Sequence, residues 1–155
     1  MDAQDRQAVY REILQLKGQL HWNGDPDEEA LALVQRWWSC VAASDWLGAR
    51  VLLHDDATMH WVTSAEHFDD ADAIVRVNEI YPSGWELTLQ EVAVLADGRV
   101  HAVVEVRQDG QRFSGHSRAV VDAGKIRSFT EWWATHDSPP AWRTAETIGA
   151  YRRES

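Results

Sequence analysis

Residues 85–133 read WELTLQEVAVLADGRVHAVVEVRQDGQRFSGHSRAVVDAGKIRSFTEWW. The segment holds β-rich runs separated by Asp97-Gly98, Asp109-Gly110 and Ala123-Gly124, which are typical of tight hairpin turns. Strands joined by tight turns pair antiparallel. The segment therefore predicts an antiparallel meander with strands over 85–95, 99–108, 111–122 and 125–133.

The residues before the meander are mostly helical in pattern. Apolar spacing predicts an amphipathic helix over 3–20 that ends at Gly18 or at Asn23-Gly24. Asp25-Pro26 is typical of a helix start, and this second helix continues to about Ala43. We further expect a short helix over 46–53, a strand over 55–62 and a third helical stretch over 69–81.

Helices followed by an antiparallel meander predict an α+β architecture. The length of 155 residues fits one domain, 1–155, in which 1–24 form an N-terminal helical extension and 136–155 a C-terminal tail.

Composition excludes several classes of partner. The formal net charge is −10, with 25 acidic and 15 basic residues, which argues against nucleic acid and anionic membranes as partners. No apolar run approaches the length of a membrane span, and the acidic, polar start at Met1–Asp5 does not resemble a signal peptide, so we expect a cytoplasmic protein.

The sequence contains no pattern for a metal or a cofactor. Cys40 is the single cysteine, and the seven histidines are scattered without the spacing of a metal site. Glycine-rich nucleotide-binding loops are missing as well. We therefore expect neither a metal nor a cofactor.

Glu131 lies among bulky aromatic residues in the last predicted strand. Because side chains alternate along a strand, Phe129, Glu131 and Trp133 share one face, and Trp132 lies on the other. Two interpretations follow. Either this face meets water, or it lines a mostly apolar pocket in which Glu131 is the charged group.

The chain resembles the nuclear transport factor 2-like superfamily, which includes SnoaL-like cyclases and ketosteroid isomerases. The first matching block runs from Arg36-Trp37-Trp38 through Ser44-Asp45-Trp46 to His54-Asp55-Asp56-Ala57-Thr58, and is similar to the two opening helices and first strand of the family. Gly124-Lys125-Ile126 and Glu131-Trp132-Trp133 resemble the closing hairpin of the family. The resemblance covers roughly residues 27–135, and it implies a strongly curved antiparallel sheet. It further implies that three helices wrap this sheet into a cone with an internal pocket, with an extra N-terminal helix in this chain, and many members of the family are dimers.

The same resemblance argues against ketosteroid isomerase activity. This sequence has Trp61 in place of the general base, Trp37 in place of the oxyanion-binding tyrosine, and approximately Ser117 in place of the neutral acid. Without these groups, the matching positions offer no general base to move a proton on a steroid enone and no acid to stabilise the oxyanion.

The resemblance places Glu131 inward with Phe129 and Trp133, and makes Glu131 the candidate catalytic residue. It also implies a candidate ligand-binding set, whose tryptophans have two open interpretations, pocket wall and plain core filler: Trp37, Trp46, Trp61, Ser117, Phe129 and Trp133. The first hypothesis is a SnoaL-like protein that binds a small apolar or aromatic molecule. If it is an enzyme, it is a carboxyl-dependent isomerase, cyclase or hydratase. The alternative is a non-enzymatic homodimeric interaction module with a vestigial pocket, using an outer sheet face that contains Val103, Val120 and Trp132.

Overall fold

The computed structural model describes residues 2–16 and 25–154. The helices are α1 (Ala3–Leu16), α2 (Pro26–Ala42), α3 (Trp46–Arg50), α4 (Ala71–Glu79) and α5 (Ala145–Ile148). The strands are β1 (Leu53–Trp61), β2 (Glu66–Phe68), β3 (Trp85–Val94), β4 (Val100–Gln108), β5 (Gln111–Asp122) and β6 (Lys125–Thr135). None of the helices in these two ranges is long and apolar enough to span a membrane.

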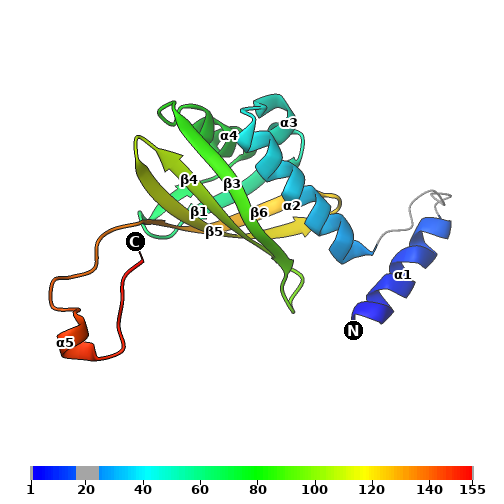
Figure 1. The fold of residues 1–155 in the computed structure, drawn as a ribbon. Coiled ribbons are helices and arrows are strands. Elements are labelled where there is room, and N and C mark those ends of the chain that lie inside the picture. The colour runs from blue at the N-terminus through cyan, green and yellow to red at the C-terminus, as the bar shows by residue number, and fades with distance from the viewer. Residues whose placement is uncertain (1, 17–24, 155) are drawn as a thin grey trace.

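The six strands form one sheet in the order β2-β1-β6-β5-β4-β3. Neighbouring strands pair antiparallel except β1 and β6, which run parallel. The predicted α+β fold with helices on one face of a curved sheet is confirmed, and the parallel pair makes the sheet mixed. In Figure 1, α2 crosses one face of the sheet, α3 and α4 lie near one end of it, and α1 and α5 lie away from it.

The tight turns of the meander have the backbone that their sequences predict. Asp109 and Gly110 have φ of 51° and 77°, and Ala123 and Gly124 have φ of 50° and 77°. Two consecutive residues with positive φ define the turn that matches the twist of paired strands. Strands β4, β5 and β6 are therefore joined by two-residue loops, with Gln108 opposite Gln111 and Asp122 opposite Lys125.

The second helix follows its predicted boundaries closely. Asp25 caps α2 by accepting a hydrogen bond from the backbone N–H of Asp27, and Pro26 occupies the first turn. The short helix is shorter than predicted, because α3 ends at Arg50 and β1 already begins at Leu53. The predicted end of the first helix, at Gly18 or Asn23-Gly24, lies outside the described residues. Strand β2 was not predicted from the sequence.

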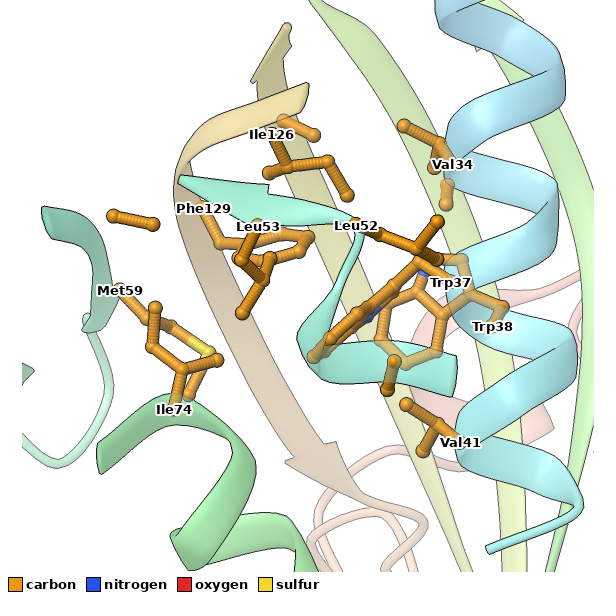
Figure 2. Close-up of a cluster of buried hydrophobic side chains, with 14 of the residues drawn as sticks. Val34, Trp37, Trp38, Val41, Leu52, Leu53, Met59, Ile74, Ile126 and Phe129 are labelled. Carbon is orange, nitrogen blue, oxygen red and sulfur yellow. The ribbon is translucent and has the colours of Figure 1, made fainter. Parts of the chain in front are cut away.

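The hydrophobic core lies between α2 and the sheet (Figure 2). Trp37 from α2 meets Phe129 from β6 with ring centroids 5.0 Å apart, and both side chains are fully buried. Val34 and Val41 extend this contact along the same helix. The core fixes α2 over the sheet, and this placement determines where the remaining unfilled space lies.

Candidate ligand-binding cavity

Four residues on neighbouring strands form a row across the inner face of the sheet, in the order Glu66, Trp61, Glu131 and Ser117. Trp61 of β1 lies opposite Glu66 of β2 on one side and opposite Glu131 of β6 on the other. Glu131 in turn lies opposite Ser117 of β5. Cross-strand neighbours on one face are close enough for their side chains to interact.

Glu131 is buried and hydrogen-bonded by two tryptophans. The side chain is 3% exposed. Its Oε1 accepts hydrogen bonds from Nε1 of Trp61 at 3.0 Å and from Nε1 of Trp133 at 3.3 Å. Among the described residues, no Lys, Arg or His forms an ion pair with it. Glu131 therefore lies inside the fold and away from solvent.

Burial raises the pKa of Glu131 because desolvation disfavours the carboxylate. The nearby Ser117 hydroxyl and the hydrogen bonds from Trp61 and Trp133 oppose this shift without reversing it. The Ser117 hydroxyl is buried near the carboxyl group but makes no hydrogen bond of good geometry with any described residue. Since both indole hydrogens go to Oε1, the proton of the neutral acid belongs on Oε2. Such a carboxyl group can hold a proton at a higher pH than an exposed glutamate.

A cavity of about 280 Å³ lies directly beside this row. Its walls are mainly aromatic and aliphatic, with a few polar groups. The lining residues are Trp38, Val41, Trp61, Thr63, Ser64, Glu66, Asn78, Tyr81, Trp85, Leu87, Val106, Phe113 and Trp133. The apolar walls are typical of a site for a small molecule, and the volume is close to the lower end of the usual range, about 300 Å³.

Trp61 and Trp133 connect the cavity to the buried carboxyl group. Both indoles line the cavity and both donate to Glu131, whereas Glu131 itself does not belong to the lining. The carboxyl group therefore holds two wall residues in place from behind. Direct contact between Glu131 and a molecule in the cavity would need one of these indoles to move.

Gly115 provides the space in which the Trp133 ring lies. A Cβ atom built on Gly115 would come within 2.7 Å of two ring carbons of Trp133, closer than real Cβ atoms approach a neighbour. Gly115 of β5 is directly opposite Trp133 of β6. Glycine is required here because the indole packs against the backbone of the neighbouring strand.

The other candidate residues lie away from the cavity walls. Trp37 and Phe129 belong to the fully buried core, and Trp46 is partly buried against that core. Ser117 is buried opposite Glu131. The roles assigned to Glu131 and to these residues from the sequence stay predictions.

Several lining residues were not among the sequence candidates, namely Trp38, Asn78, Tyr81, Trp85 and Phe113. A partial signal existed for Trp85, since Trp85 and Leu87 alternate with polar residues at the start of β3. No comparable signal distinguished Trp38 from Trp37, because the two are adjacent on α2 and both are buried. Within residues 2–16 and 25–154, no group of three or more His, Cys, Asp or Glu side chains is arranged to hold a metal ion.

Comparisons with known proteins match the fold and leave the chemistry open. No protein-family model matches the chain, and no curated protein is significantly similar to it in sequence. Solved structures do match. A proposed ketosteroid isomerase from Kribbella flavida is 23% identical, with a TM-score of 0.71 over 83% of this chain and 92% of that one.

Two further solved structures show how varied the similar proteins are. An epoxide hydrolase of Mycobacterium tuberculosis, described as LEH-like, is 16% identical with a TM-score of 0.56, covering 69% of this chain and 84% of that one. A proposed polyketide cyclase from Xanthomonas campestris is 19% identical with a TM-score of 0.57, covering 69% of this chain and 91% of that one. The chain therefore has the nuclear transport factor 2-like fold, as the resemblance implied. Because one fold serves many chemistries, function must be argued from the cavity.

Proposed function

We propose that the protein binds a small apolar or aromatic molecule in the cavity between α2, α4 and the inner face of the sheet. The observation that carries this proposal is the cavity of about 280 Å³ with four tryptophans in its wall. Tryptophan is a large side chain that normally fills space, so four of them around an unfilled volume favour a binding site.

The test is a ligand screen read by thermal denaturation and by tryptophan fluorescence. A molecule present at 100 times its dissociation constant stabilises the native state by about 2.7 kcal/mol, which raises the melting temperature of a domain of this size by roughly 5–10 °C. Fluorescence should change together with stability, because Trp61, Trp85 and Trp133 line the cavity.

A matched pair of variants ties binding to the cavity. Val106 lies on the inner face of β4 in the cavity wall, so Val106→Phe should fill the space and abolish binding. Val120 is 37% exposed on the outer face of β5, so Val120→Phe should bind normally. Equal binding by both variants would place the ligand elsewhere and would contradict the proposal.

We further propose that the protein is an enzyme, a carboxyl-dependent isomerase, cyclase or hydratase in which Glu131 is the catalytic group. In this proposal, the raised pKa of Glu131 keeps the proton available on Oε2, and the group acts as the general acid once an indole has moved aside. Glu131→Gln should keep ligand binding and lower turnover about 10²–10⁴-fold. Unchanged turnover would leave the protein as a binder without this chemistry.

The second candidate function is a non-enzymatic dimeric interaction module. It is favoured by the row Val103, His116 and Trp132 across the outer face of the sheet. The guanidinium carbon of Arg118 lies 5.3 Å from the centroid of the Trp132 ring beside this row. If no small molecule binds and a stable dimer forms, the result favours the interaction module over ligand binding.

A further inference from the structure

The charge in the cavity has one sign. Of the described residues that line it, none is Lys, Arg or His, and Glu66 is the one with a formal charge. The chain as a whole carries a net charge of −10. An anionic ligand would therefore meet a carboxylate and no compensating cation.

The acidic groups lie on both sides of one wall residue. Trp61 is opposite Glu66 in β2 and opposite Glu131 in β6, and its Nε1–H is donated to Glu131. An indole that donates its hydrogen to a carboxylate becomes richer in electrons, and the face of its ring becomes more attractive to a positive charge. A cation near Trp61 would also favour the charged form of Glu131, which burial disfavours.

Aromatic side chains make up a large share of the wall. Six of the thirteen lining residues are aromatic: Trp38, Trp61, Tyr81, Trp85, Phe113 and Trp133. A positive charge held close to aromatic rings gains about 0.5–2 kcal/mol, and quaternary ammonium groups are bound in this way. A bare metal ion gains nothing comparable here, because metals need a cluster of ligating atoms and the walls are mostly apolar.

We infer that the cavity selects a small organic cation, a quaternary ammonium or protonated amine attached to an apolar or aromatic body. This inference rests on the proposed function, since it assigns a ligand class to the same cavity. The aromatic walls surround the body and the charged nitrogen, and Glu66 supplies negative charge at the Trp61 end.

The test compares two probes of nearly the same shape. Benzyltrimethylammonium carries a positive nitrogen, and 2,2-dimethylpropylbenzene has a carbon atom in its place. Dissociation constants for both are measured by calorimetry and tryptophan fluorescence on the full chain. The cation should bind about tenfold more tightly than the neutral probe, and added salt should weaken binding of the cation alone.

Two pairs of variants test which residues cause the preference for the cation over the neutral probe. Glu66→Gln should reduce the affinity for the cation about two- to fivefold and leave the neutral probe unaffected. Glu86→Gln removes the same charge from the exposed outer side of β3 and should change neither affinity. Trp85→Leu should lower the affinity for the cation more than that for the neutral probe, whereas Trp142→Leu, in the exposed C-terminal tail, should have no effect.

The outcomes separate this inference from the proposed function. If the neutral probe binds as tightly as the cation, the preference for cations is overturned and the cavity remains a site for apolar molecules. If neither probe binds at millimolar concentration and the broader screen is also negative, both the inference and the proposed function fail.

Discussion

Nε1 of Trp61 lies 3.0 Å from Oε1 of Glu131, and the two residues are 70 positions apart in the sequence. The parallel pairing of β1 with β6 places them side by side. The bond joins a residue of the cavity wall to a carboxyl group without a basic partner among the described residues. Much of the behaviour expected of this protein follows from this contact.

Trp61→Phe should destabilise the protein more than Trp38→Phe. The first change removes a hydrogen bond to a buried carboxyl group, which costs about 1–3 kcal/mol in the free energy of unfolding. The second removes an indole N–H that is buried without a partner among the described residues, so only packing is lost. Urea denaturation of both variants at neutral pH measures the difference, and equal losses would mean that the Trp61 bond contributes nothing.

The stability of Glu131→Gln relative to the wild type should increase as the pH rises. The folded pKa of Glu131 lies above its unfolded value near 4.5, so the native state binds the extra proton between the two values. The stabilisation is complete below the unfolded pKa and is lost as the pH rises through the folded pKa. Glutamine keeps an oxygen for the indoles and has no proton to lose.

The measurement is the difference in unfolding free energy between variant and wild type across this pH range. Hydrogen bonds from Arg50 and Arg107 lower the pKa of Asp55 and Glu105, respectively, so both proteins lose stability in acid. These groups are the same in both proteins and cancel in the difference. A difference that is constant with pH would show that the pKa of Glu131 does not change on folding.

Gly115→Ala should displace the Trp133 indole. The new methyl group would overlap the ring, and overpacking of this kind typically costs about 1–3 kcal/mol. The cost should fall when Trp133→Leu is already present, because a smaller side chain leaves room for the methyl group. A double-mutant cycle should give a coupling of about 0.5–3 kcal/mol. Simple additivity of the two changes would rule out the steric explanation.

The chain should form a homodimer through the outer face of the sheet. Val120 and Trp132 lie on this face, and a stable interface typically buries well over ~1,000 Å² in total. Analytical ultracentrifugation should give twice the chain mass of 17.6 kDa at micromolar concentration. Val120→Asp should shift the protein toward monomer, and Val51→Asp, the same change at an exposed valine just after α3, should not. A monomer across the whole concentration range contradicts the prediction.

Local sequence was enough to predict the meander and the second helix. Asp109-Gly110 and Ala123-Gly124 adopt positive φ in two-residue turns, and Asp25-Pro26 begins α2, because each feature depends on the backbone preferences of a few adjacent residues. Strand alternation likewise placed Phe129, Glu131 and Trp133 on one face, because a strand has only two faces, but it left open whether that face is buried.

Long-range packing determined the rest of the site. The pairing of β1 with β6 has no turn to mark it, since a parallel pair needs a long connection, and this pairing brings Trp61 to Glu131. The position of α2 over the sheet separates Trp37, which packs on Phe129 in the core, from Trp38, which lines the cavity. A cavity is the volume left over after all elements have packed, so no single segment of the sequence encodes it.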